Sequence, residues 1–262
     1  METNIRPVGV LDSGVGGISV LRDVVRLMPG EDFLYYGDSA NAPYGTKAAQ
    51  TVVDLTVKNT EFLLERGAKA IVVACNTATS VAIRLLREKY PDMPVIGIEP
   101  ALKPAVKAKE HSKVLVMATP MTLEQQKFND MMHYYETDAD IIKVPCPGLV
   151  ELIEAGHLDG PELMKYLEQR FAPYKDEQID AAVLGCTHYP LIRPMVQKML
   201  PEGAVIYDGG FGTARETKRR LEECGLLNGR DSGGKVTFFN SKDSEKILEL
   251  SERLLMLPIE GE

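Results

Sequence analysis

The chain alternates short apolar runs with longer segments in which apolar residues recur at helical spacing. In the first part of the chain, the apolar runs predict strands at 8–11, 33–36 and 70–74. The helical spacing predicts helices at 18–27 and 50–65, which end at Pro29-Gly30 and at Gly67. Strands that alternate with helices favour parallel βαβ units, so the pattern predicts an α/β fold with mostly parallel sheets.

The same alternation begins again near residue 113. Strands are expected at 113–118, 141–144 and 181–185, and helices at 150–155 and 161–171. Two apolar runs match closely, because each ends in a cysteine, at Cys75 and Cys186. A further short apolar run follows each cysteine at nearly the same distance, at 95–97 and 205–207. A period of about 110 residues indicates an internal duplication into two similar lobes rather than a short-repeat solenoid.

The end of the chain does not fit this repeat. It is expected to contain a flexible link at Gly209-Gly210, a helix at 213–227, a strand at 235–240 and a last helix at 245–255. We expect this tail to fold back on the first lobe. The predicted domains are therefore 1–97 with 208–262, and 98–207.

Composition narrows the class of protein. Hydrophobic residues make up 44% and charged residues 26% of 262 residues, as in ordinary globular proteins. The net charge of −8 argues against a broad nucleic-acid interface. No apolar run reaches the roughly 20 residues of a membrane span, and no signal peptide is recognisable. Four cysteines without a CxxC pair indicate neither a disulfide scaffold nor a zinc site, and favour free thiols in a reducing cytoplasm.

Three chemically capable residues directly follow predicted strands, namely Asp12, Cys75 and Cys186. In open parallel sheets, ligands bind beyond the carboxyl ends of the strands. A cysteine there also faces the N-terminus of the next helix, which lowers its pKa and suits it to act as a base near neutral pH. The alternative, a small buried hydrophobe, is the usual fate of a lone cysteine. The duplication favours reactive thiols at 75 and 186, whereas Cys146 and Cys224 lack this context and are interpreted as structural.

Other polar residues near these strand ends have two interpretations each. Asp12 can be a helix N-cap, and His188 can activate the neighbouring thiol or only satisfy local hydrogen bonds at a helix that Pro190 begins. The glycine-rich loop at 14–19 is not a GxGxxG motif, because Ser19 occupies the third glycine position, and it lacks the lysine of a P-loop. Such a turn can still bind a carboxylate through backbone N–H groups.

The remaining candidates are short polar donors and one loop. Asn76, Thr77 and Thr187 suit either helix capping or a small carboxylate ligand. The Pro43-Tyr44-Gly45 segment is a surface loop by composition, and acts as a lid or only as a turn. Glu154 has the pattern of a solvated helix face.

Taken together, these motifs resemble the glutamate racemases of the cofactor-independent aspartate/glutamate racemase superfamily. The matching segments span most of the chain and are Leu11-Asp12-Ser13-Gly14-Val15-Gly16-Gly17, Tyr36-Gly37-Asp38 with Pro43-Tyr44-Gly45, Ala74-Cys75-Asn76-Thr77-Ala78, and Leu184-Gly185-Cys186-Thr187-His188-Tyr189-Pro190. The resemblance implies two α/β lobes with the active site between them. It also implies interconversion of L- and D-glutamate, with D-glutamate supplied to peptidoglycan synthesis in the cytoplasm.

By this resemblance, Cys75 and Cys186 are the two acid/base residues. Asp12 matches the carboxylate that assists the first thiol and His188 the histidine that assists the second, while Glu154 matches another helper, with Glu151 close by in sequence. Substrate contacts are implied for Asp12, Ser13, Tyr44, Gly45, Asn76, Thr77, Thr187 and His188. The family needs no cofactor or metal, although the sequence alone does not decide against pyridoxal phosphate. Its partners would be glutamate and a second copy of the chain.

Three other functions remain open at this point. A racemase or isomerase of the same superfamily could act on aspartate, a hydantoin or maleate. Acyl transfer by a Cys–His nucleophile would make one cysteine dispensable. A binding module for an acidic amino acid would bind without proton exchange at Cα.

Overall fold

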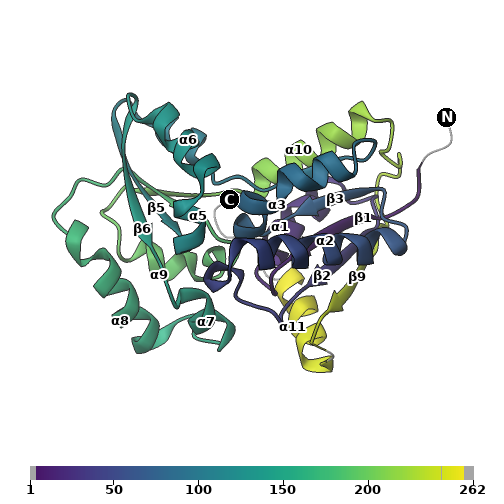
Figure 1. Cartoon of the computed structure of the whole chain (residues 1–262). Coiled ribbons are helices and arrows are strands. Elements are labelled where there is room, and N and C mark those ends of the chain that lie inside the picture. Colours follow the sequence, from purple (N-terminus) through teal and green to yellow (C-terminus); the bar gives the residue numbers. More distant parts are fainter. Residues whose placement is uncertain (1–3, 243, 257–262) are drawn as a thin grey trace. The chain divides into compact units, whose positions relative to one another are not determined.

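The computed structural model describes residues 4–242 and 244–256, and its chain divides into two compact units (Figure 1). The first unit contains residues 1–99 and 210–262, and the second contains 100–209. Each unit has its own sheet, and every strand pair within both sheets is parallel. The predicted α/β class with mostly parallel sheets is confirmed, whereas the treatment of the units as separate domains stays a prediction.

The first unit has five strands in the order β4-β3-β1-β2-β9. Their bounds are β1 Val8–Asp12, β2 Phe33–Gly37, β3 Ala70–Val73, β4 Val95–Gly97 and β9 Val236–Asn240. The helices of this unit are α1 Ile18–Leu27, α2 Ala49–Glu65, α3 Asn76–Lys89, α10 Gly210–Glu223 and α11 Glu245–Met256, with a 3-10 turn η1 at Tyr44–Thr46. Every residue of β1 and β3 is buried, as expected for central parallel strands covered on both faces.

The second unit has four strands in the order β6-β5-β7-β8. Their bounds are β5 Ser112–Ala118, β6 Ala139–Pro145, β7 Ala181–Leu184 and β8 Val205–Asp208. The helices are α4 Leu102–Lys107, α5 Pro120–Glu124, α6 Gln126–Tyr135, α7 Leu149–Glu154, α8 Gly160–Phe171 and α9 Arg193–Gln197, with 3-10 turns η2 at Ala172–Tyr174 and η3 at Tyr189–Ile192. Apolar side chains pack on both faces of this sheet and form two core clusters.

The two sheets repeat the same strand order, which supports the internal duplication. The order β4-β3-β1-β2 matches β8-β7-β5-β6 strand for strand. Leu11 pairs with Val73 in one sheet, as Met117 pairs with Leu184 in the other. Because each cysteine follows its paired strand residue by two positions, Cys75 and Cys186 are equivalent positions of the repeat.

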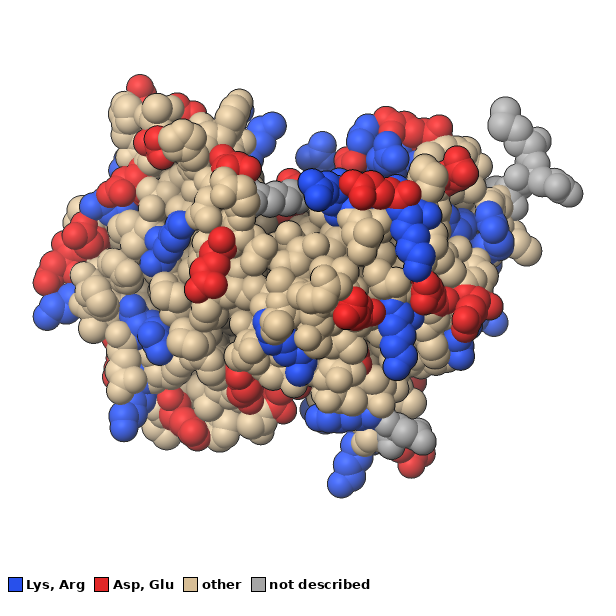
Figure 2. Space-filling model, in the orientation of Figure 1, with Lys and Arg blue, Asp and Glu red and all other residues tan. Residues whose placement is uncertain are grey.

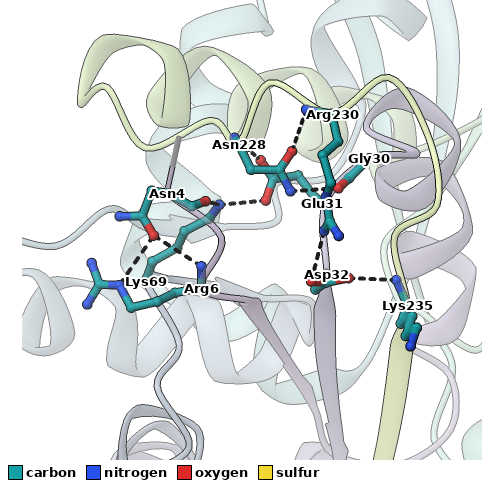
Figure 3. A network of polar contacts seen from close by, with 9 residues as sticks. All are labelled: Asn4, Arg6, Gly30, Glu31, Asp32, Lys69, Asn228, Arg230 and Lys235. Carbon is teal, nitrogen blue, oxygen red and sulfur yellow. Dashed lines mark hydrogen bonds and ion pairs between the residues drawn. The ribbon is translucent and has the colours of Figure 1, made fainter. Parts of the chain in front are cut away.

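The tail adds β9 to the β2 edge of the first sheet. Figure 3 shows the polar network that fixes this addition at the amino ends of the strands. Buried Glu31 accepts hydrogen bonds from the Lys69 ammonium at 2.5 Å and from the backbone N–H of Asn228 at 2.7 Å. Asp32 accepts from the backbone N–H of Lys235 at 2.9 Å, immediately before β9. Removing one partner of a buried, paired carboxylate strongly destabilises the folded protein. The network therefore fixes the register in which the tail pairs with the first sheet.

Two details of the predicted tail are wrong. Gly210 is not part of a flexible link, because it is the first residue of α10. The helix ends at Glu223 rather than at Leu227, because Gly225 adopts a positive φ of 64°. The N–H of Leu226 then donates back to the Leu221 carbonyl at 2.8 Å, which closes the helix end as a glycine terminus does.

In the face shown in Figure 2, Lys and Arg side chains are interspersed with Asp and Glu, without a broad patch of one sign. Among the described residues, no helix combines the length and the apolar character that a bilayer span needs.

Candidate active site

In the first unit, Cys75 lies between the end of β3 and the start of α3. It is the N-cap residue of this helix, and its sulfur accepts a hydrogen bond from the backbone N–H of Ala78 at 3.5 Å. The Ser13 hydroxyl lies 3.6 Å from the same sulfur. The thiol is 5% exposed. A helix N-terminus and an N–H donor both favour the thiolate form of a cysteine, so the local structure suits Cys75 to proton transfer.

Asp12 lies on the neighbouring strand, as the last residue of β1, and is fully buried. Its Oδ2 accepts a hydrogen bond from the backbone N–H of Gly14 at 3.0 Å. The N-cap interpretation of Asp12 is wrong, because α1 begins at Ile18 and its N-cap is Gly17. A Cβ at Gly17 would lie 2.5 Å from the Asp12 Cβ, so glycine allows the turn to close over the carboxylate.

Asn76 is the first residue of α3 and is buried beside Cys75. Within the part of the chain that the structure describes, neither its amide nitrogen nor its amide oxygen has a hydrogen-bond partner. An unsatisfied buried amide costs roughly 1–3 kcal/mol and is rare in folded proteins, which makes Asn76 a candidate ligand contact. Thr77, the next residue, is also buried.

The Tyr44 side chain holds the loop that carries Tyr44 and Gly45 in place, although the composition of this segment predicted a surface loop. Tyr44 is 1% exposed, so this part of the predicted surface loop is instead buried. Its hydroxyl donates to Asp38 Oδ2 at 2.6 Å and accepts from Asn59 Nδ2 at 3.0 Å. Burial, reinforced by the Asp38 carboxylate, raises the pKa of Tyr44 well above its ordinary value. The Tyr44 hydroxyl is therefore neutral and already engaged by Asp38 and Asn59.

The second unit presents a different set of groups around the equivalent thiol. Cys186 follows β7, and its sulfur lies 3.9 Å from Nδ1 of His188. Nε2 of the same ring lies 2.9 Å from Oε1 of Glu154, the last residue of α7. His188 is 1% exposed. Because an ionised carboxylate accepts only, the ring presents an N–H to Glu154, and Nδ1 faces the sulfur.

No regular α-helix begins at Cys186, which corrects the helix-terminus argument for this thiol. The 3-10 turn η3 starts at Tyr189 with Pro190 in its first turn, and the short helix α9 follows only from Arg193. The group beside this sulfur is therefore the His188 ring, at 3.9 Å, rather than the N-terminus of an α-helix. Thr187, between the two, is buried.

The register of the repeat shows which groups the second unit does not share. Asp12 pairs with Gly37 as Ala118 pairs with Pro145, so alanine stands where the first unit has its carboxylate. By the same register, Cys146 is the counterpart of Asp38. Burial raises the pKa of the Cys146 thiol to about 12, so this cysteine stays protonated in the core near neutral pH. Cys224 is exposed.

The structure adds two residues to the predicted set, Asp38 and Asn59. Both are buried, and both contact the Tyr44 hydroxyl. Asp38 belongs to the Tyr36-Gly37-Asp38 motif, so its position after a strand was a usable signal. Asn59 lies within α2, and its sequence context gave no signal. Among the described residues, no group of three or more His, Cys, Asp or Glu side chains could hold a metal ion.

Each unit thus places a cysteine at an equivalent position of the repeat, with polar groups beside its sulfur. Comparisons with known proteins show which family the chain belongs to. The model of the Asp/Glu/hydantoin racemase family matches residues 8–215. A glutamate racemase of Clostridium botulinum (strain Hall) is 53% identical over 254 residues, covering 97% of this chain and 98% of that protein.

Solved structures show the same likeness. Glutamate racemase RacE1 from Bacillus anthracis superposes with a TM-score of 0.87 at 32% identity, covering 97% of this chain and 95% of that one. The Escherichia coli enzyme in complex with L-glutamate and the activator UDP-MurNAc-Ala gives 0.84 at 31% identity, with 95% of each chain covered. The chain belongs to the Asp/Glu/hydantoin racemase family. It is an isomerase, an amino-acid racemase.

Proposed function

We propose that this racemase interconverts L- and D-glutamate, with Cys75 and Cys186 as its two acid/base groups. The observation that carries the proposal is the pair of buried thiols at equivalent positions of a duplicated fold. The substrate follows from the relatives. The Clostridium botulinum protein is a glutamate racemase, and related structures are complexes with L-glutamate, in Escherichia coli, and with D-glutamate, in Francisella tularensis.

In the proposed reaction, one thiolate removes the Cα proton and the other thiol returns a proton to the opposite face. The C–H electron pair remains on the substrate as a carbanion delocalised into the α-carboxylate. The first sulfur ends as a thiol and the second as a thiolate, and the reverse reaction exchanges these roles. The mechanism requires the two sulfurs to face opposite sides of one carbon, a requirement that one thiol cannot meet.

The helpers differ between the two halves. Asp12, on the strand beside Cys75, assists the first thiol by forming an ion pair with the substrate ammonium group and orienting it. His188 assists the second thiol, since its Nδ1 lies 3.9 Å from the Cys186 sulfur. Glu154 keeps the other ring nitrogen protonated and raises the basicity of the ring.

Substrate binding is proposed for the predicted donors around the two thiols. The Asn76 amide, without a partner among the described residues, gains hydrogen bonds when a carboxylate binds. Preplaced donors also stabilise the charge that develops on the α-carboxylate in the transition state. The proposed contacts are Asp12, Ser13, Tyr44, Gly45, Asn76, Thr77, Thr187 and His188. Tyr44 contributes through its backbone, since Asp38 and Asn59 engage its hydroxyl.

Solvent-proton exchange tests this function. The protein is incubated with L-glutamate in deuterated water without added cofactor, and optical rotation and Cα deuteration are followed. We expect both to change together. Failure of both would rule out racemisation of glutamate, and binding without exchange would indicate a binding module. Aspartate, a hydantoin and maleate are run in parallel to test the related substrates.

Cysteine variants test the mechanism. Cys75→Ser and Cys186→Ser should each lower kcat at least about 10³-fold, because a serine hydroxyl is far too weak an acid for this transfer. Cys224→Ser, an exposed cysteine, serves as the matched control and should retain activity. Near-normal turnover in either site variant would refute the two-thiol mechanism. A covalent acyl-enzyme that needs only Cys186 would favour acyl transfer instead.

The biological setting is proposed from family likeness. D-glutamate formed in the cytoplasm would supply peptidoglycan synthesis and hence cell-wall formation and cell shape. Cells depleted of this protein should then need added D-glutamate in order to grow. A homodimer is part of the same proposal, and sedimentation of the purified protein tests it.

A further inference from the structure

The strand that the tail adds to the first sheet ends beside the loop that carries Tyr44 and Gly45. β9 runs parallel to β2, and Asn240 pairs with Gly37 at the carboxyl end of both strands (Figure 1). The tail residues that follow this pair therefore meet the first residues of the loop after β2. This contact lies at the same edge of the sheet as Asp12 and Cys75.

Three hydrogen bonds join the tail to the start of this loop. The Asn240 amide nitrogen donates to the Ser39 hydroxyl at 2.9 Å, and the backbone N–H of Ala40 donates to the Ser241 hydroxyl at 2.9 Å. The backbone N–H of Ser241 donates to the Gly37 carbonyl at 2.9 Å. The tail thus contacts three of four consecutive residues where the chain leaves β2.

The Asn240 side chain is itself held in this orientation. Its amide oxygen accepts from the backbone N–H of Lys242 at 2.9 Å, which directs the amide nitrogen toward Ser39. Gly37 provides the space for this approach. A Cβ at Gly37 would lie 2.8 Å from the Asn240 amide nitrogen and 2.6 Å from the Gly14 carbonyl oxygen.

Anchors on the far side of the loop complete the arrangement. Asp38 receives the Tyr44 hydroxyl at 2.6 Å and the Asn41 amide at 2.9 Å. Asp38 therefore joins the two ends of the loop, Asn59 of α2 contacts Asp38 and Tyr44, and the tail contacts the first residues. Among the described residues, the sheet of the second unit has no counterpart of β9, since its matching edge strand is β6. β9 and the residues after it thus give the loop contacts that the duplicated elements do not provide.

We propose that Asn240 and Ser241 are positioning residues for substrate binding, and that they act through the loop of residues 38–45. This inference rests on the proposed function, because it takes glutamate as the ligand and Tyr44 and Gly45 as contacts. Neither tail residue touches the reacting atoms. Their loss should weaken substrate binding and leave proton transfer between thiol and Cα unchanged.

The test compares Asn240→Ala, Ser241→Ala and the double variant with wild type, in the full chain. Each single variant should raise the KM for L- and D-glutamate about fivefold, which corresponds to one ordinary hydrogen bond. The kcat should stay within about twofold, since a change in KM alone marks lost uniform binding. Ser241→Thr keeps the hydroxyl and should restore the wild-type KM. Thr237→Ala, an exposed position on the same strand, is the matched control.

Hydrogen exchange of the free protein supplies a readout that does not depend on activity. Residues 38–45 should exchange faster in Ser241→Ala and Asn240→Ala than in Thr237→Ala. Faster exchange with an unchanged KM would overturn the inference while leaving the racemase function intact. Unchanged exchange would overturn it too. A fall in kcat that accompanies a fall in melting temperature would also overturn it, since the residues would then be only structural. A wild-type protein that neither binds nor racemises glutamate would overturn both proposals.

Discussion

The imidazole of His188 and the carboxylate of Glu154 form a partly buried hydrogen bond of 2.9 Å between Nε2 and Oε1. The other ring nitrogen faces the Cys186 sulfur. The Cys75 sulfur accepts a hydrogen bond from the backbone N–H of Ala78 at the start of a helix. Two thiols at equivalent positions are thus supported by chemically different groups.

Replacing Glu154 by Gln should test the coupling through His188. The amide can still accept from the ring but carries no charge, so the ring becomes less basic, and kcat/KM should fall about 10- to 100-fold. The loss should be equal for both enantiomers, because their equilibrium constant is one. Glu151→Gln, an exposed carboxylate on the same helix, is the matched control and should leave kcat/KM unchanged. A similar effect of both substitutions would contradict a specific role for Glu154.

Tyr44→Phe should mainly affect stability. The buried Asp38 carboxylate loses its 2.6 Å donor, which costs about 1–3 kcal/mol of unfolding free energy. In an Asp38→Asn background, the same change should cost less, because no charge is left without its donor. Urea unfolding of the four proteins of this double-mutant cycle measures the coupling. Additive effects would contradict the coupling between the hydroxyl and the carboxylate.

The strands and the placement of the thiols could be predicted because they depend on local sequence. An apolar run that ends in Cys75 or Cys186 fixes a strand end, and parallel pairing brings strand ends to one edge. Glu154 and Glu151 could not be separated in this way. They are three residues apart on a short helix, and only the folded structure shows that Glu154 is the one that contacts His188.

Contacts between residues far apart in the sequence also could not be predicted from local sequence patterns. Asn59 reaches Asp38 and Tyr44 from another helix, and Asn240 reaches Ser39 from the tail. The turn after Cys186 was misjudged because Pro190 fits a 3-10 turn as well as an α-helix. Proline constrains its own φ and removes one N–H, and neither property distinguishes the two.

Asp180 should contribute stability that disappears in acid. It accepts from the Lys109 ammonium at 2.6 Å and from the backbone N–H of Lys113 at 2.9 Å. The hydrogen bond from Lys109 and then that from Lys113 lower the pKa of Asp180 below its ordinary 3.8. The contribution is therefore complete above pH 3.8 and is lost as pH falls through the lowered pKa. Asp180→Asn should lower stability by roughly 1 kcal/mol at pH 7.

A comparison of unfolding free energies at several pH values tests this dependence. The difference between wild type and Asp180→Asn should be constant from pH 7 to about pH 5 and should shrink below pH 4. A difference that grows as the pH falls would show that the carboxyl has a raised pKa in the folded protein.

Asn76→Ala should separate binding from stability. Because neither amide atom of Asn76 has a partner among the described residues, its removal should cost less than about 1 kcal/mol of unfolding free energy. Loss of the donor should raise the KM for glutamate about tenfold or more. Asn59→Ala is the comparison variant, because the Asn59 amide donates hydrogen bonds to Tyr44 and Asp38. This variant should lose stability. Calorimetric unfolding with steady-state kinetics measures both; a destabilised Asn76→Ala with unchanged KM would make Asn76 structural.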